Sequence, residues 1–117
     1  MRNTGPSRAT VELVRDRDLH MCARCGASQP LTTQHRVARG MGGSRAAWIN
    51  QPANLVTLCG SGTTGCHGHV EHHPAEAREA GLAVSRNGPP PERVAVLTWR
   101  GWLELDNAGG ARALSDA

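Results

Sequence analysis

Four cysteines in two pairs are the residues whose types and spacing most clearly predict chemistry in this chain. Zn²⁺ prefers four ligands in a tetrahedron, and each pair can offer two thiolates to one ion. Two residues separate the first pair and six separate the second, and three of those six are glycines that let the chain loop out. We therefore predict one structural zinc site, with the ligands Cys22, Cys25, Cys59 and Cys66.

Two disulfides or four free thiols are the alternatives to a zinc site. Disulfides need an oxidising compartment, and the N-terminal residues 1–6 have no apolar run of the kind found in a signal peptide. No stretch is apolar enough over a sufficient length to cross a bilayer, so we expect a soluble protein of the bacterial cytoplasm with no membrane partner. This setting favours zinc over disulfides.

A second candidate site adjoins the cysteines and contains histidine. His67 directly follows the last cysteine, and Glu71 lies four residues later, on the same face of an expected helix. Such a pair can hold one divalent cation, and Gln34 can add a weak carbonyl ligand. Imidazole, carboxylate, amide and water ligands suit magnesium, manganese or zinc. His72 is the main rival of Glu71 for this site.

His35 is a candidate general base, because a neutral imidazole can take a proton from water near neutral pH. It follows Gln34 and lies between the two cysteine pairs, so the metal-binding scaffold should hold it near the second site. We expect the other four histidines to be surface residues, namely His20, His69, His72 and His73.

The composition predicts a small domain with a weak core. The 117 residues include no Phe, no Tyr and only three Trp, so little apolar surface can be buried, and a structural metal is a common remedy. All thirteen basic residues are Arg. Residues 1–48 carry a net charge of +5 and residues 49–117 a net charge of −2. The basic first part is a plausible surface for phosphate.

The order of expected elements predicts an α+β domain. We place a disordered tail at residues 1–9, a single domain at residues 10–106 and a flexible tail at residues 107–117. Within the domain the pattern predicts a helix from Thr10 to about Leu19, an extended segment over 30–37, a short strand or buried turn over 54–59, helices over 66–72 and 74–80, and a hairpin of 94–99 with 102–105.

The ordered set of cysteines, histidines and Asn54 resembles the His-Asn-His (HNH) endonuclease family, in the subgroup with four zinc-binding cysteines. The similarity covers about residues 15–75, and it further resembles small stand-alone HNH proteins of actinobacterial phages and prophages. It rests on Cys22-Ala-Arg-Cys25-Gly26, Gln34-His35-Arg36-Val37, Gly42-Gly43, Asn54-Leu55-Val56-Thr57-Leu58-Cys59 and Cys66-His67. The resemblance implies a ββα-metal (His-Me finger) fold around one catalytic cation.

The resemblance also implies roles for single residues. His35 would activate water, Asn54 would hold the loop that orients His35, and His67 would bind the catalytic cation. That cation would be Mg²⁺ or Mn²⁺, with Zn²⁺ or Ni²⁺ as alternatives. The family commonly has Asp or His at the position of Gln34, and His at that of Glu71, so the ligand set departs from the usual one. The candidates for gripping the DNA backbone are Arg36, Arg39 and Arg45.

The expected activity is that of a metal-dependent DNA endonuclease, a phosphodiester hydrolase that leaves 5′-phosphate and 3′-hydroxyl ends. A phage-encoded protein linked to DNA packaging, with terminase or other packaging proteins as partners, is the biological setting that the resemblance suggests. The alternative is a catalytically silent zinc module that binds DNA or a protein of a phage packaging complex. Cation-dependent plasmid cleavage discriminates between the two.

Overall fold

Two small antiparallel sheets and three short α-helices make up the described part of the chain, residues 5–38 and 47–114 of a computed structural model. The α+β class predicted from the sequence is confirmed. The elements are α1 (Arg8–Arg17), β1 (Leu31–His35), β2 (Leu55–Cys59), α2 (Gly65–His72), α3 (Pro74–Glu79), β3 (Val96–Thr98), β4 (Gly101–Leu105) and β5 (Ala111–Ala113), with 3-10 turns at Ala47–Asn50, Pro52–Asn54 and Pro91–Arg93.

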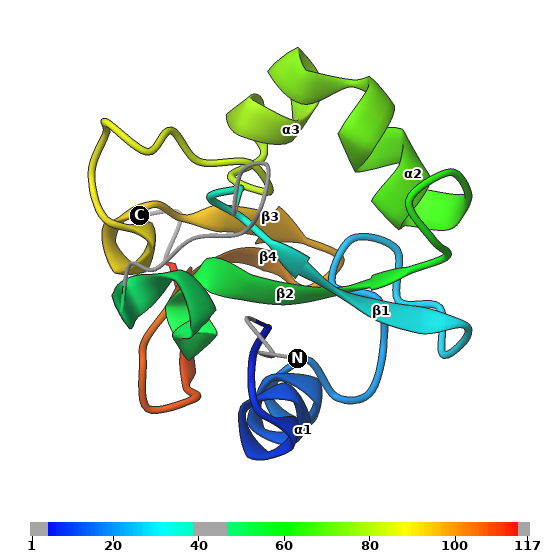
Figure 1. Cartoon of the computed structure of the whole chain (residues 1–117). Helices are drawn as coiled ribbons and strands as arrows, with labels where there is room; N and C mark the ends of the chain where they lie inside the picture. Colours follow the sequence, from blue (N-terminus) through cyan, green and yellow to red (C-terminus); the bar gives the residue numbers. More distant parts are fainter. Residues whose placement is uncertain (1–4, 39–46, 115–117) are drawn as a thin grey trace.

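The pair β1–β2 forms the centre of the molecule, with α1 on one side and α2 with α3 on the other (Figure 1). Its register pairs Thr32 with Leu58 and Gln34 with Val56. Residues directly opposite each other in an antiparallel pair share a face, so these four side chains lie on one face. Thr32 and Gln34 both contact side chains of α2, which identifies it as the face that α2 covers.

The second sheet has the order β3-β4-β5. The predicted hairpin is present, but its two-residue turn is Trp99 and Arg100, one residue earlier than predicted, because Gly101 already pairs with Thr98. The predicted tail at residues 107–117 is wrong in its first part, because β5 pairs with β4. A turn made by Asp106, whose carboxylate accepts from two backbone N–H groups, brings the chain back for this pairing.

The N-terminal boundary also differs from the prediction. The first helix begins at Arg8, and its cap is Ser7, whose hydroxyl oxygen accepts a hydrogen bond from the backbone N–H of Thr10 at 3.1 Å. The sequence predicted a start at Thr10, which is also a residue type that caps helices well, but the helix begins two residues earlier and ends at Arg17. The region predicted as a tail therefore contains the first turn of α1.

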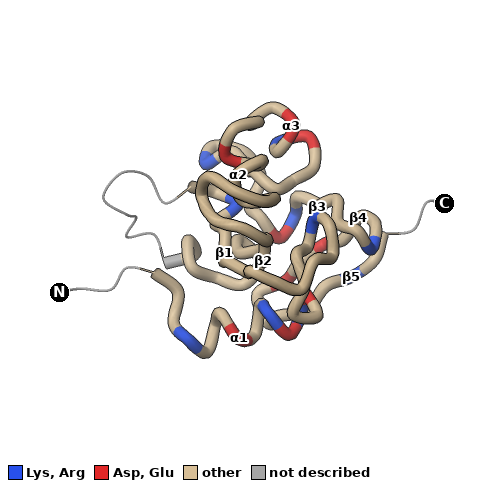
Figure 2. The backbone as a smooth tube through the Cα atoms, turned by 90° about the vertical axis from the view of Figure 1, so that its right-hand side faces the viewer, with Lys and Arg blue, Asp and Glu red and all other residues tan. Residues whose placement is uncertain are grey.

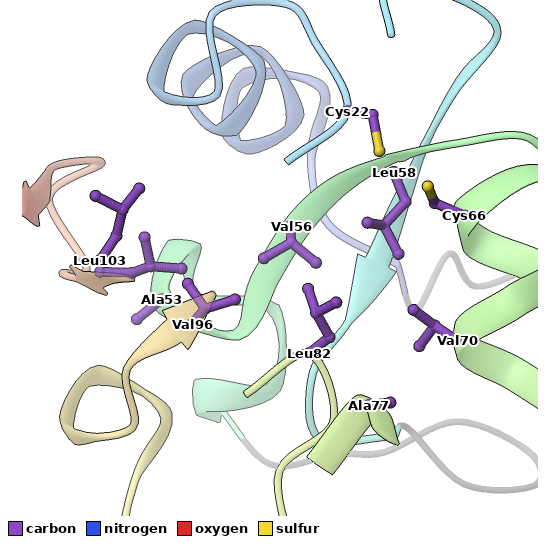
Figure 3. Close-up of a cluster of buried hydrophobic side chains, with 11 residues drawn as sticks. Cys22, Ala53, Val56, Leu58, Cys66, Val70, Ala77, Leu82, Val96 and Leu103 are labelled. Carbon is purple, nitrogen blue, oxygen red and sulfur yellow. The ribbon is translucent and has the colours of Figure 1, made fainter. Parts of the chain in front are cut away.

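The core is built from small aliphatic side chains and two cysteines, gathered between β2, α2 and the second sheet (Figure 3). Trp99 and Trp102 are 46% and 38% exposed, so neither belongs to it. This agrees with the small core predicted from the composition. The buried members of the cluster are Cys22, Ala53, Val56, Leu58, Cys66, Val70, Ala77, Leu82, Val96, Leu103 and Leu105.

Two buried arginines, Arg17 and Arg36, tie the elements together. The guanidinium of Arg17 forms a two-pronged ion pair with Asp18, at 2.9 and 3.0 Å, and donates to the carbonyls of Pro52 and Leu55. The Asp18 carboxylate in turn accepts from the backbone N–H of Thr57 at 2.9 Å. The end of α1 is thereby fixed to β2.

Arg36 is also buried, with 2% of its surface exposed. Its guanidinium donates to four backbone carbonyls at 2.5–3.0 Å, those of Gly81, Ala53, Pro91 and Val94. Burial, together with the positive charge of Arg17, lowers the pKa of Arg36 to about 10, so the group stays protonated at neutral pH. Arg36 thus joins the end of β1 to the segment between α3 and β3.

We predict that Arg36→Met destabilises the fold by about 3 kcal/mol or more, because each buried carbonyl that loses a charged donor costs about 1–3 kcal/mol. Urea unfolding followed by circular dichroism measures this. Arg86→Met is the matched control: Arg86 is exposed and donates a hydrogen bond to the Ala38 carbonyl. It should change stability by less than about 0.5 kcal/mol. Equal stability of the two variants would contradict the structural role of Arg36.

No helix within the described residues has the length and apolarity needed to cross a membrane.

Candidate functional site

The four cysteines come from three segments and meet at one point. Cys22 and Cys25 lie in the turn after α1, Cys59 ends β2, and Cys66 lies in the first turn of α2. Their sulfur atoms all lie within 4.8 Å of one another, and none is in a disulfide. The Sγ atoms of Cys25 and Cys59 are 3.7 Å apart. A tetrahedron with Zn–S bonds of about 2.3 Å has edges of about 3.8 Å, so the site can hold a metal and its geometry is compatible with zinc.

The groups around the sulfurs favour thiolates. Backbone N–H groups of Cys25 and Cys66 point at the Sγ atoms of Cys22 and Cys59, each at 3.4 Å. The guanidinium of Arg24 donates to Cys66 Sγ at 3.3 Å. Burial nevertheless raises the pKa of the Cys66 thiol to about 12, with Arg24 opposing the rise. A bound cation is therefore needed to hold all four sulfurs ionised at neutral pH, and its binding would release protons.

The glycine-rich insert closes the second cysteine pair as the sequence predicted. Gly60 and Gly65 have φ values of +89° and +62°, which non-glycine residues rarely adopt. A Cβ on Gly60 would lie 2.1 Å from the Thr64 carbonyl oxygen. The two glycines thus let the chain fold back tightly between Cys59 and Cys66.

The cluster of Cys22, Cys25, Cys59 and Cys66 is called the clip. His67 directly follows its last cysteine and is oriented by β1. The hydroxyl of Thr32 donates to the Leu58 carbonyl at 3.1 Å and lies 2.8 Å from Nδ1 of His67. A hydroxyl has one hydrogen, so the Thr32 oxygen accepts from Nδ1–H of His67. The lone pair of His67 is then on Nε2, the arrangement that metal-binding histidines usually have.

Glu71 and Gln34 lie next to that nitrogen. Nε2 of His67 is 3.7 Å from Oε1 of Glu71, and the Gln34 amide donates to the same oxygen at 3.1 Å. The structure therefore brings together the three residues that the sequence suggested for a cation. His72, the rival of Glu71, and Glu71 itself are both exposed, but Glu71 is the one that lies beside Nε2 of His67.

His35 and Asn54 lie at the other end of the β1–β2 pair. Nε2 of His35 is 2.7 Å from Oδ1 of Asn50, so Nε2–H donates and the proton-accepting lone pair is on Nδ1. His35 pairs with Leu55, on the strand face opposite that of Gln34. Gln34, Glu71 and His67 thus form one contact group and His35 with Asn50 forms another, so these contacts do not place His35 beside the second site as the sequence predicted.

Asn54 is buried and holds the backbone around His35. Its amide oxygen accepts from the N–H of Val37 at 2.8 Å, and its amide nitrogen donates to the carbonyls of Val37 and Ile49. These bonds tie together the two ends of the segment 37–49. This geometry is what a residue that orients His35 indirectly would need.

The arginines predicted to grip DNA have mixed outcomes. Arg36 cannot do so, because it is enclosed and donates to four carbonyls; that prediction is corrected. Arg39 and Arg45 lie outside the described residues. Two arginines that sequence reasoning missed reach the segment after His35: Arg86 donates to the Ala38 carbonyl, and Arg78 lines a depression with Ala38.

Thr32 and Asn50 were also missed. The alternation of side chains along a strand could have placed Thr32 on the same face as Gln34, but only the pairing of β1 with β2 shows that this face meets α2. Asn50 has no sequence signal, since it reaches His35 from a separate 3-10 turn.

A scan against protein-family models gives no match, and searches of curated proteins and of solved structures likewise return none. The functional inference is therefore carried by the resemblance in the sequence motifs and by the contacts of the side chains.

Proposed function

We propose that this protein is a metal-dependent DNA endonuclease of the HNH type, and that its four-cysteine clip holds a structural zinc ion. The observation that carries the proposal is the orientation of His67: Thr32 holds its Nδ1–H, and Nε2 faces the Glu71 carboxylate beside Gln34. An imidazole nitrogen, a carboxylate and an amide form a donor set that suits a divalent cation.

The residues present fit such a cation. His67 would offer Nε2 and Glu71 a carboxylate oxygen. The Gln34 amide would turn to present Oε1 in place of the Nε2 that now donates to Glu71, an exchange that a side-chain amide makes by rotating its last bond. When bound, Mg²⁺ or Mn²⁺ supplies a Lewis acid that stabilises charge on phosphate oxygens.

His35 would act as the general base. Asn50 accepts its Nε2–H and so fixes the tautomer whose Nδ1 can take the proton of an attacking water. Asn54 would act as a positioning residue, because it holds the backbone on both sides of the segment after His35. Hydrolysis by water attack at phosphorus would leave 5′-phosphate and 3′-hydroxyl ends.

The DNA backbone would be held by arginines near His35. Figure 2 shows basic positions along the described chain with acidic positions between them. Arg86 donates to the carbonyl of Ala38, three residues after His35, and Arg78 lines the same depression as Ala38; both would bind phosphates without reading sequence.

The experiment that tests the proposal is plasmid cleavage by the purified protein. Loosely bound cations are removed by dialysis without a strong chelator, so that the clip keeps its metal. Nicked or linear plasmid should then appear on addition of Mg²⁺ or Mn²⁺, and a DNA ligase, which needs 5′-phosphate and 3′-hydroxyl ends, should reseal the nicks. A folded protein that binds DNA without cleaving it under any divalent cation would favour the silent zinc module.

We predict that Thr32→Val weakens Mn²⁺ binding by about 10–100-fold, the usual cost of removing the group that orients a metal-binding histidine. Free Mn²⁺ measured by electron paramagnetic resonance gives the affinity. Thr33→Val is the matched control, since Thr33 lies on the opposite face of β1, away from His67. Equal Mn²⁺ affinity of the Thr32 variant and wild type would show that the Thr32 contact does not orient His67 for a cation.

A further inference from the structure

A second group of metal-ligating side chains lies on the side of α2 turned away from His67. His69 and His73 are near-parallel, with ring centroids 4.0 Å apart, and Nε2 of His69 is 2.5 Å from Oε2 of Glu76. One ligand atom from each of these three residues lies within 4.8 Å of the others. Two residues along a helix turn about 200°, so His69 and His67 serve different faces.

Local sequence explains this grouping. His69 and His73 are four residues apart, hence neighbours at the end of α2. Pro74 then occupies the first position of α3 and sets the turn that brings Glu76 back toward His69. Nδ1 of His73 donates to the His69 carbonyl at 2.9 Å. Its lone pair is therefore on Nε2, and the backbone holds the ring as a second-shell partner would.

We infer that His69, His73 and Glu76 form a binding site for a borderline divalent transition metal such as Zn²⁺, separate from the clip and from the proposed catalytic cation. Two imidazoles and one carboxylate are a donor set of zinc sites that keep the fourth position open. Imidazole donors disfavour Mg²⁺ and Ca²⁺. The cation would take the place of the hydrogen now shared by His69 and Glu76.

The fit requires only side-chain movement. Ligand atoms around Zn²⁺ at about 2.1 Å lie about 3.4 Å apart, so the 2.5 Å contact would widen and the other separations would close. His73 and Glu76 are exposed and can rotate. Arg24 lies between this group and the clip: it donates to Cys66 Sγ, and its other nitrogen is 3.9 Å from Glu76. A cation here would thus move the Glu76 carboxylate away from Arg24 and link α2 to α3 through its ligands His69 and Glu76.

Calorimetric titration of Zn²⁺ into the full chain with a zinc-loaded clip tests this site. The titration uses a His67→Gln background, which removes a ligand of the proposed catalytic cation. The result for the His69 site therefore does not depend on whether the proposed function is right. We expect one further equivalent of Zn²⁺ to bind. Adding His69→Gln or His73→Gln should weaken it by at least tenfold, since loss of an outer-shell partner alone costs about 10–100-fold. The ¹⁵N signals of the His69 and His73 imidazoles should shift with Zn²⁺ and stay unchanged with Mg²⁺.

His20→Gln in the same background is the matched control. His20 and Asp16 form an exposed pair four residues apart, 2.7 Å between Nε2 and Oδ1, with two donors in place of three. This variant should bind Zn²⁺ as its parent does. The inference is overturned if the His67→Gln protein binds no Zn²⁺ beyond its clip, or if binding survives loss of His69 and of His73.

Discussion

Replacing Cys59 by serine should unfold the domain and abolish zinc binding at the four cysteines. Cys59 is the last residue of β2, and its Sγ lies 3.7 Å from that of Cys25 and accepts from the Cys66 backbone N–H. The serine hydroxyl is a poor zinc ligand at neutral pH. Loss of one ligand therefore disconnects β2 and α2 from the turn that follows α1.

The size of the effect follows from the weakness of the core. No aromatic residue belongs to the main buried cluster. Single domains are stable by about 5–15 kcal/mol in all, and structural zinc in small modules contributes about 10–16 kcal/mol of apparent binding free energy. The free energy of zinc binding at the clip would thus be as large as the net stability of the whole domain, so loss of the clip should unfold the protein.

Circular dichroism and zinc content by atomic absorption measure the outcome. Gly62→Ala is the matched control in the same insert: Gly62 has an ordinary φ, and an added Cβ would meet no atom within 4 Å. It should keep its zinc and its fold. A Cys59→Ser protein that stayed cooperatively folded without metal would show that packing alone maintains the structure.

The sequence was sufficient for features whose determinants are local. The spacing of the cysteines predicted both halves of the clip, and the 3.6-residue period placed Glu71 beside His67. The hairpin was found because two apolar runs flank a short turn. In each case the residues that decide the geometry are neighbours in the chain or are paired by a short spacing.

Features that depend on distant segments were missed. Arginines are mostly exposed, so composition favoured Arg36 as a DNA contact; only the fold shows four carbonyls from distant segments around it. The strand β5 has three small or charged exposed residues and no periodic apolar signal, and its pairing depends on the turn at Asp106. The partner of His35, Asn50, is likewise fixed by tertiary contacts.

His35→Ala should abolish plasmid cleavage, on the proposal that this protein is a nuclease. Loss of a general base typically costs about 10²–10⁴ in rate. His35 is a half-buried residue at the end of β1, outside the main buried cluster and the cysteine clip. Its removal also ends the hydrogen bond to Asn50, worth about 1 kcal/mol. The fold and the zinc content should therefore persist.

The variant must be compared under conditions that separate chemistry from folding. Initial rates of supercoil relaxation in Mn²⁺ are measured for wild type, His35→Ala and the control His20→Ala, which removes an exposed histidine bonded to Asp16. The control should cleave as wild type does. Added imidazole should restore part of the His35→Ala rate, because it replaces the missing base, whereas a merely structural loss would not respond. Cleavage by His35→Ala at the wild-type rate would show that another group activates the water.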